Sequence, residues 1–380
     1  MDIDILVIGA GPAGLAVAAT LIGKGRRPLV IEKAETVGAS WRAHYARLHL
    51  HTVKTLSALP GLPFPDEQPR YVPRQSVVDY LSAYAAHAGI EPLFGEEAIA
   101  VVRDGGAWRT TTRSGKTFRS SVVVVTTGAN HHPNVPRIEG EREFAGRILH
   151  SRDYRDATPF AGQRVLVVGM GNTGAEIALD LAEHGVATTL SVRSPVNIVL
   201  RDVLGRATQE TSLLLSRLPR RVGDALASFF ARVSVGDIER LGLRRSAMSP
   251  LRELRELGRT PVIDVGTLAS IRAGKIAVRP GITRLHAGTV EFVDGKTAPT
   301  DVIVLATGYR AGIDALFPGL AVPVDDNGLP THVVGEGPLA GIYFVGFDTR
   351  QPGGLLRTIA MQAVAVGERI CAGAAASVPA

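Results

Sequence analysis

The sequence contains a single cysteine, Cys371, among 380 residues, and this scarcity excludes two kinds of chemistry. One thiol cannot form an internal disulfide, and it cannot supply the pair of cysteines that a dithiol redox enzyme requires. Cys371 lies in an apolar segment near the end of the chain, so we interpret it as a small apolar residue of a C-terminal helix.

Aromatic residues make up only 5% of the chain, whereas glycine, alanine and valine are abundant. This composition favours strands packed closely on helices over a β-sandwich. The formal net charge is +6, and no nucleic-acid-binding motif accompanies the basic excess. We therefore expect phosphorylated small molecules, and neither nucleic acid nor a metal ion, as ligands.

Long apolar runs are also missing, because no stretch of 18 or more residues is free of charges and helix breakers. The sequence thus predicts no transmembrane segment. The first 22 residues differ from a signal peptide, since Asp2 and Asp4 replace its positive charges and glycines interrupt the run. We expect a cytoplasmic protein.

One pattern occurs twice: a strand, a glycine-rich turn and a helix. Residues 3–8 and 164–168 are the two predicted strands, and a Gly-x-Gly-x-x-Gly turn follows each of them. In this context the turn is the fingerprint of a dinucleotide-binding Rossmann domain, whose helix N-terminus receives a diphosphate. The predicted fold class is α/β with two Rossmann-like domains.

The first turn has an acidic rim. Glu32 ends the second predicted strand, 21 residues after Gly11, where a carboxylate can accept hydrogen bonds from ribose hydroxyls. The second turn has a basic rim, because the equivalent position is Val192 and Arg193 and Ser194 follow. A carboxylate there would repel a 2′-phosphate, whereas guanidinium and hydroxyl groups bind one. We therefore predict FAD at the first turn and NADPH at the second.

The remaining pattern predicts a helix at 75–88, a β-meander at 97–125 and a closing helix at 355–372. We expect a discontinuous FAD-binding domain at 1–155 and 298–380, and an NADPH-binding domain at 156–297. The arginine-rich segment 203–258 is predicted to be a helical insert. Its role has three interpretations: a solvated subdomain or lid, a dimer contact, or a membrane-surface face suggested by residues 213–233.

Residues 144–154 match the signature of class B flavin monooxygenases, with Phe144, Gly146, His150 and Tyr154 at its defining positions. We interpret His150 as a structural, hydrogen-bonded histidine. Over nearly its whole length the chain resembles the YUCCA-type flavin monooxygenases, the plant indole-3-pyruvate oxygenases. The resembling segments are 38–42, 47–65, 74–84, 191–205, 236–245, 258–276, 289–296 and 302–309.

This resemblance implies a monooxygenase that uses FAD, NADPH and dioxygen through a C4a-peroxyflavin. It implies oxidative decarboxylation of an aryl-2-oxo acid, such as indole-3-pyruvate, to indole-3-acetate. Two alternatives stay open: N- or S-oxygenation of a small amine or sulfide, and an NADPH-dependent flavin reductase or electron-transfer protein. A homodimer is possible, and an arginine of the insert or Arg201 is a candidate to bind a substrate carboxylate.

His51 is the one candidate catalytic residue, as a side chain that lines the flavin, with a packed pocket histidine as the alternative. The predicted FAD-binding residues are Gly9, Gly11, Pro12, Ala13, Gly14, Glu32, Lys33, Ser40, Trp41, Arg42, His51, Thr52, Thr127, Gly128 and Leu355. The predicted NADPH-binding residues are Gln75, Gly169, Gly171, Asn172, Thr173, Gly174, Arg193, Ser194, Ala306, Thr307 and Gly308. The chain departs from the family at residues 126–128, where Thr-Thr-Gly replaces Ala-Thr-Gly.

Overall fold

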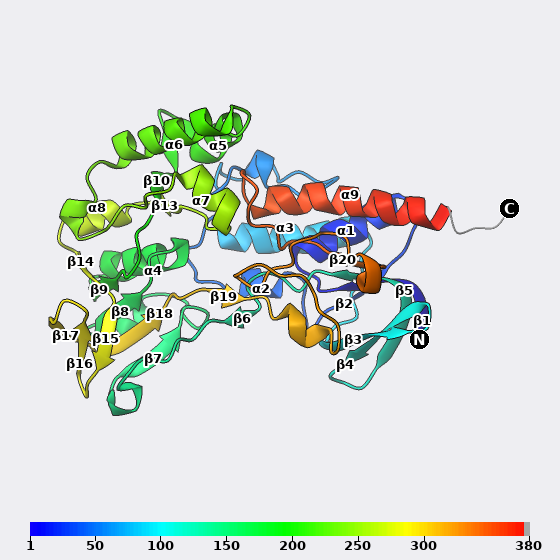
Figure 1. The fold of residues 1–380 in the computed structure, drawn as a ribbon, viewed down its shortest axis with the longest axis horizontal. Coiled ribbons are helices and arrows are strands. Elements are labelled where there is room, and N and C mark those ends of the chain that lie inside the picture. Colours follow the sequence, from blue (N-terminus) through cyan, green and yellow to red (C-terminus); the bar gives the residue numbers. More distant parts are fainter. Residues whose placement is uncertain (376–380) are drawn as a thin grey trace. The chain divides into compact units, whose positions relative to one another are not determined.

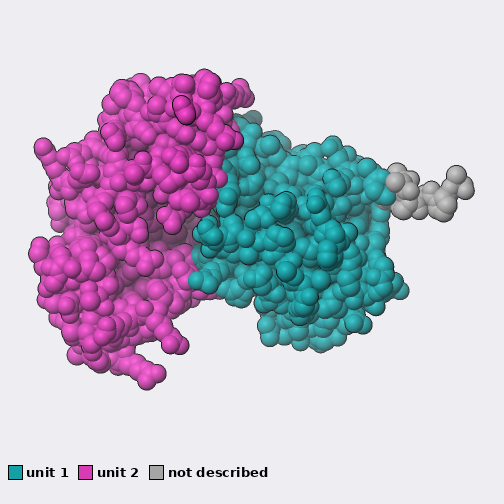
Figure 2. Space-filling model, in the orientation of Figure 1, with its two compact units in different colours: residues 1–43, 52–132, 309–380 teal, residues 44–51, 133–308 magenta. Residues whose placement is uncertain are grey.

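The computed structural model describes residues 1–375, and the chain forms two compact units (Figures 1 and 2). Unit 1 contains residues 1–43, 52–132 and 309–380, and unit 2 contains residues 44–51 and 133–308. The two long crossings follow closely after the Thr-Gly pairs at 127–128 and 307–308.

These boundaries differ from the predicted ones at 155/156 and 297/298. The reason is strand pairing. Strands β7 (Arg147–His150) and β18 (Val302–Leu305) were expected in the FAD-binding domain, but both belong to the sheet of unit 2. Strand β18 pairs in parallel with β7 on one edge and with β8 (Arg164–Val168) on the other. Without β18 and β7, this edge of β8 would lack a hydrogen-bonding partner.

The sheet of unit 1 has a Rossmann core with an antiparallel extension. Strand β1 (Asp2–Ile8) pairs in parallel with β2 (Leu29–Ile31) and with β5 (Thr117–Val125). The nine-residue strand β5 uses its other edge twice. Its first half pairs with β4 (Ala107–Thr112), which pairs with β3 (Ala98–Asp104), and its second half pairs with β20 (Ile342–Phe344).

Helix α1 (Pro12–Gly23) is buried along most of its length, because alanine, valine and leucine occupy every face. It packs against β1, α3 (Arg74–His87) and α9 (Leu355–Ala375). The short helix α2 (Ala39–Arg42) packs on α3. The remaining short elements of this unit are the 3-10 turns η1 (Lys54–Leu56), η5 (Ile313–Leu316) and η6 (Gly337–Leu339) and strand β19 (Tyr309–Arg310).

The sheet of unit 2 is entirely parallel, in the order β14-β9-β8-β18-β7. Strand β9 (Ala187–Ser191) pairs with β8 on the side away from β18, and β14 (Ile276–Arg279) pairs with the far edge of β9. Helix α4 (Asn172–Glu183) follows β8 and packs on β8, β9 and α8 (Thr267–Arg272). This order is the predicted Rossmann arrangement, with the glycine-rich turn at the carboxyl end of β8.

The predicted helical insert is present. It contains α5 (Thr208–Leu215), α6 (Arg220–Val235) and α7 (Pro250–Leu257), preceded by the hairpin β11 (Asp202–Val203) and β12 (Arg206–Ala207). The parallel pair β10 (Ile198–Leu200) and β13 (Val262–Asp264) lies at its base. The other elements are β6 (His132–Pro133), η2 (Glu141–Glu143), η3 (Thr158–Phe160), η4 (Glu239–Leu241) and the antiparallel β15 (Ile282–Leu285), β16 (Thr289–Phe292) and β17 (Thr297–Pro299).

Candidate functional site: two dinucleotide cradles

The first glycine-rich turn allows a contact that only glycine permits. A Cβ atom on Gly14 would lie 1.8 Å from the carbonyl oxygen of Gly9, so helix α1 could not pack this closely on the turn. Gly9 itself has φ +113°, and a Cβ there would lie 2.8 Å from the carbonyl oxygen of Thr126. The turn is therefore held between β1, β5 and α1.

Gly11 differs from these two glycines. No protein atom lies within 4 Å of the position that its Cβ would take, so the backbone is open on that side. Gly11 is the N-cap of α1 and no side chain caps the helix, so the first N–H groups are available to an anion. This opening at the positive end of a helix suits the diphosphate of a dinucleotide.

Glu32 lies at the rim of this turn and is only 9% exposed. Its two carboxylate oxygens accept hydrogen bonds from the backbone N–H of Ala10 at 2.7 Å and of Ala34 at 3.0 Å. Glu32 thus fixes the glycine-rich turn to the end of β2. A carboxylate has further lone pairs, which suit the ribose hydroxyls of the predicted FAD.

Thr126, the departure from the family pattern, has a structural reason. Its buried hydroxyl donates to the carbonyl oxygens of Ile8 at 2.7 Å and Gly9 at 3.1 Å. The extra hydroxyl therefore ties the end of β5 to the glycine-rich turn.

The second turn repeats this geometry in unit 2. A Cβ on Gly174 would lie 1.9 Å from the carbonyl oxygen of Gly169, and one on Gly169 would lie 2.6 Å from that of Ala306. Gly171, like Gly11, is an N-cap with open space beside it. Ala306 therefore occupies here the place that Thr126 occupies in the first turn.

Asn172, which the sequence predicts to bind NADPH, makes two hydrogen bonds within the protein. Its amide nitrogen donates to the carbonyl oxygen of Pro261 at 3.2 Å, and its amide oxygen accepts from the N–H of Ile263 at 2.7 Å. Both ends of the carboxamide thus hold β13 beside the start of α4.

Three arginines gather at the rim of the second turn. Arg193 and Ser194 follow β9 and are exposed. Arg279, in register with Ser191 on the neighbouring strand, ends β14, and Arg244 donates to the carbonyl oxygen of Arg193. The sequence pattern identified Arg193, but Arg244 and Arg279 come to this rim only through the folding of distant segments.

The signature segment has a structural function. Nε2 of His150 lies 3.1 Å from the carbonyl oxygen of Gly308, and its Nδ1 accepts from the N–H of Arg152 at 3.1 Å. Burial lowers the pKa of His150, which favours the neutral ring that this pair of contacts requires. The structure thus agrees with the structural interpretation of this histidine.

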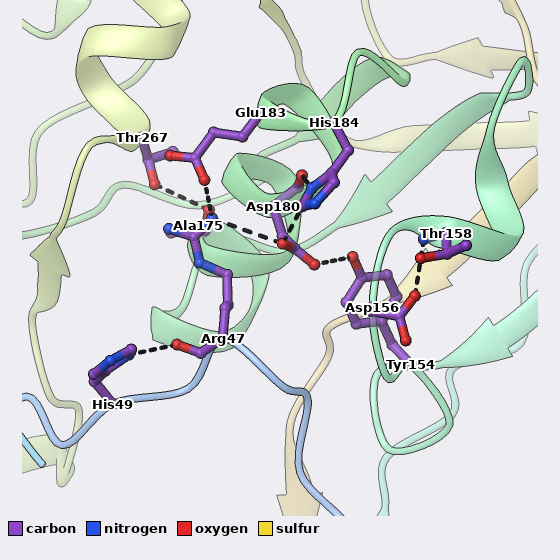
Figure 3. A network of polar contacts seen from close by, with 10 residues as sticks. All are labelled: Arg47, His49, Tyr154, Asp156, Thr158, Ala175, Asp180, Glu183, His184 and Thr267. Atoms are coloured by element: carbon purple, nitrogen blue, oxygen red, sulfur yellow. Dashed lines mark hydrogen bonds and ion pairs between the residues drawn. The ribbon is translucent and has the colours of Figure 1, made fainter. Parts of the chain in front are cut away.

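Tyr154, the last signature position, points to helix α4 (Figure 3). Its buried hydroxyl donates to Asp180 at 2.5 Å, and burial together with this carboxylate raises the pKa of Tyr154. Arg47 reaches the same helix, with 2.7 Å between its Nη1 and an oxygen of Glu183 and 3.9 Å between Nη1 and Asp180. The start of α8 is fixed as well, since Thr267 donates to the carbonyl oxygen of Ala175 at 2.9 Å.

Residues 44–51 form a strap that runs along α4, and His51 is its last residue. Nε2 of His51 pairs with the carboxylate of Glu176, which is 3% exposed. Tyr45 also hydrogen-bonds Glu176, and burial followed by this carboxylate raises the pKa of Tyr45. Sequence reasoning missed Tyr45, Arg47, Glu176 and Asp180. The available signal was the spacing of Glu176, Asp180 and Glu183 along one face of an otherwise apolar helix.

The predicted residues separate between the units. Those predicted for FAD lie in unit 1, except His51, and those predicted for NADPH lie in unit 2, except Gln75. Thr52 hydrogen-bonds Ser57 at 2.7 Å, Arg42 donates to Ser82 at 2.9 Å, and Gln75 donates to Asp79 at 2.9 Å. Within residues 1–375, no group of three or more His, Cys, Asp or Glu side chains is arranged to hold a metal ion.

Comparison with known proteins decides the family, because residues 3–322 match the flavin-binding monooxygenase-like family. The chain belongs to this family. An indole-3-pyruvate monooxygenase of Oryza sativa, YUCCA1, is 39% identical, and the match covers 93% of this chain and 88% of that protein. The probable indole-3-pyruvate monooxygenase YUCCA3 of Arabidopsis thaliana is 37% identical, over 91% of this chain and 82% of that protein.

Among solved structures, a flavin-containing monooxygenase from Stenotrophomonas maltophilia has the same fold. Its TM-score is 0.74 at 23% identity, and the match covers 98% of this chain and 99% of that one. These results confirm the predicted α/β fold and the prediction of a flavin-dependent monooxygenase. They also confirm FAD and NADPH as its predicted cofactors. No helix within residues 1–375 is long and apolar enough to cross a membrane.

Substitution of the crowded Gly14 and of the open Gly11 in the first turn should affect different properties, namely stability and flavin binding. Gly14→Ala should destabilise the apoprotein by roughly 1–3 kcal/mol, because its Cβ overlaps the Gly9 carbonyl. Gly11→Ala should keep the stability of the apoprotein and weaken flavin binding by at least about tenfold, because its Cβ would fill the open space predicted for the diphosphate. Thermal unfolding and flavin absorbance after purification measure the two effects.

Gly23→Ala is the matched control, because Gly23 lies in the same helix with open space around it. It should retain both stability and flavin. A Gly14→Ala protein as stable as the wild type would contradict the packing argument.

His150 predicts a pH dependence of stability. Its folded pKa is lowered, so the unfolded chain takes up the proton first as the pH falls below about 6.5. The stability that neutral His150 contributes is present above that pH and is lost on acidification, at a slope of at most about 1.4 kcal/mol per pH unit. Urea unfolding between pH 5 and pH 8 should show a shallower loss for His150→Gln than for the wild type.

Other histidines with a lowered pKa add to the slope of both proteins, so the difference between the two slopes reports His150 alone. His131 is one of them, because burial lowers its pKa to about 4. His87→Gln, at an exposed position of α3, is the control and should keep the wild-type slope. Equal slopes for His150→Gln and wild type would show that His150 is not held neutral.

Proposed function

We propose that this enzyme oxidatively decarboxylates an aryl-2-oxo acid, such as indole-3-pyruvate, to the acid one carbon shorter. The observation that carries the proposal is similarity over nearly the whole chain to proteins named as indole-3-pyruvate monooxygenases. The two matches cover 91% and 93% of this chain, so the similarity extends beyond the cofactor-binding fingerprint. A cytoplasmic location and a homodimer stay predictions.

The reaction balances with one NADPH, one dioxygen and one proton for each oxo acid. The bond between the ketone carbon and the carboxylate carbon breaks, and carbon dioxide leaves. One oxygen atom enters the shorter acid and the other leaves as water, with NADP⁺ as the remaining product. The bound flavin supplies the transfer of electrons from NADPH to dioxygen, and the protein binds and orients the reactants.

The chain's own contributions follow from the two cradles. In unit 1 the open backbone at Gly11 and the carboxylate of Glu32 suit the diphosphate and ribose of FAD. In unit 2 the opening at Gly171 suits the diphosphate of NADPH, and the rim arginines suit its 2′-phosphate. His51 is bonded to Glu176, so we propose that it acts by positioning the strap and not as an acid or base.

The rim predicts the choice of nicotinamide cofactor. Arg193→Ala should raise the KM for NADPH at least about tenfold, because a lost charge-assisted contact costs about 1.5–3 kcal/mol. The KM for NADH should stay nearly unchanged, since NADH carries no 2′-phosphate. Steady-state NADPH and NADH oxidation measures both constants.

Lys275→Ala is the matched control, because Lys275 precedes β14 at the end of the strand opposite Arg279. It removes the same charge and should leave both constants at their wild-type values. Wild-type NADPH kinetics in Arg193→Ala would remove Arg193 from the cofactor site.

Rapid mixing tests the reaction class. NADPH-reduced enzyme mixed with aerated buffer should show a transient near-ultraviolet band, and indole-3-pyruvate should accelerate its decay. Product analysis should find indole-3-acetate and carbon dioxide in equal amounts, above a control without enzyme.

Two other outcomes identify the alternatives. A transient band that does not respond to the oxo acid, with oxide products from amines or sulfides, would establish N- or S-oxygenation. Rapid oxidation without a transient band would favour an NADPH-dependent flavin reductase or electron-transfer protein.

A further inference from the structure

Helix α6 of the insert buries mostly small residues and exposes most of its large apolar ones, with Leu226 and Val235 as the exceptions. The buried positions are Gly223, Ala227, Ala231 and Val235. Phe229 and Val233 are 59% and 66% exposed, and Val222 and Phe230 are exposed as well. An amphipathic helix of a protein core has the opposite arrangement, with its large apolar side chains inside. The face that α6 turns to solvent is therefore built for an apolar environment.

Packing explains why the inner face is small. A Cβ on Gly223 would lie 2.6 Å from the carbonyl oxygen of Leu215 at the end of α5, so α5 and α6 approach closely (green in Figure 1). Helix α5 and the turn after it add exposed Leu214 and Leu218. Phe229 and Phe230 are not part of the buried apolar cluster of the insert, which contains Leu215, Ala227 and Leu251.

The hairpin before α5 exposes a further leucine. Leu204 is fully exposed and, within residues 1–375, is the one residue other than glycine with positive φ, at +51°. Positive φ is unfavourable for a leucine, and full exposure gives no packing in return. Because nothing within the chain offsets this cost, the exposed Leu204 side chain points to a contact outside the chain.

The charge around these apolar side chains is positive. Exposed Arg217, Arg220, Arg221 and Arg232 lie on α6 or in the turn before it, and none of them forms an ion pair within 4 Å with the described residues. The acid of α6, Asp224, is neutralised by Arg255 at 2.7 Å. The face therefore combines protruding phenylalanines with unpaired guanidinium groups.

We propose that the face formed by Leu214, Leu218, Val222, Phe229, Phe230, Val233 and these four arginines docks on a bilayer that contains anionic lipid. Helices that lie in the membrane interface have this composition, with aromatic and aliphatic side chains entering the acyl region and arginines contacting headgroup phosphates. The enzyme is thereby a peripheral membrane protein whose docking surface is the insert.

A second copy of the chain fits this face less well. A twofold contact through it would place the four arginines of one copy against those of the other, with no exposed acid on α6 to compensate them. Anionic headgroups neutralise the same arginines without such repulsion.

The test is sedimentation of the FAD-loaded full-length enzyme with vesicles of phosphatidylcholine, alone or mixed with phosphatidylglycerol. Wild-type enzyme should bind the mixed vesicles, and bind them less at high salt. Phe229→Gln/Val233→Gln should weaken binding by at least about tenfold, because two exposed side chains lose their apolar burial. Arg220→Gln/Arg221→Gln should weaken it by roughly 25-fold, about fivefold for each charge near the surface.

Ile99→Gln is the matched control, because Ile99 is an exposed apolar side chain of strand β3 in unit 1 and lies outside the insert. It should bind like the wild type, and all variants should retain flavin and NADPH oxidation, which excludes misfolding. Wild-type enzyme that stays in the supernatant with mixed vesicles at low salt would overturn the proposal. Self-association abolished by Phe229→Gln/Val233→Gln, without vesicle binding, would assign the face to a second copy.

Discussion

The close approach of a helix to a carbonyl oxygen is the constraint on which the rest of this structure depends. In each unit the third glycine of the turn lies where any Cβ would overlap the carbonyl of the first, at 1.8 Å in one and 1.9 Å in the other. This contact sets the start of α1 and of α4, and with it the free N–H groups that can receive a diphosphate. The open space at Gly11 and Gly171 can receive a diphosphate only because the neighbouring glycines let the helix N-terminus approach the turn closely.

Around this shared plan the two turns are stabilised differently. Thr126 and Glu32 use hydrogen bonds to fix the first turn to β5 and β2. In the second unit, helix α4 presents Glu176, Asp180 and Glu183 to the strap and to Tyr154. Glu176 and Asp180 are buried, and a buried carboxylate is costly without partners, so these two acids require the phenols and cations that surround them. Tyr154 of the family signature is one such partner, because its hydroxyl donates to Asp180. The signature therefore has a structural role.

The insert follows a different rule from the rest of the fold. The sheets bury valine and leucine as expected, whereas α6 buries glycine and alanine and exposes phenylalanine. Such an arrangement lowers the stability of an isolated domain, since the apolar area that helix packing would bury stays in water. The insert thus has the character of a surface shaped by an external contact and attached to a conventional cofactor-binding core.

The sequence by itself determined the two Rossmann units, their glycine-rich turns and the acidic and basic rims, because these depend on local spacing within about thirty residues. It also determined the family, through resemblance over nearly the whole chain. Tertiary structure alone decided that β7 and β18 complete the second sheet, since strand pairing joins segments distant along the chain. It also decided that Arg244 contacts Arg193, that Arg279 ends the strand beside β9, and that His51 pairs with Glu176. Local pattern shows that segment 213–233 is apolar and basic, but which side of α6 faces outward depends on what packs beneath it.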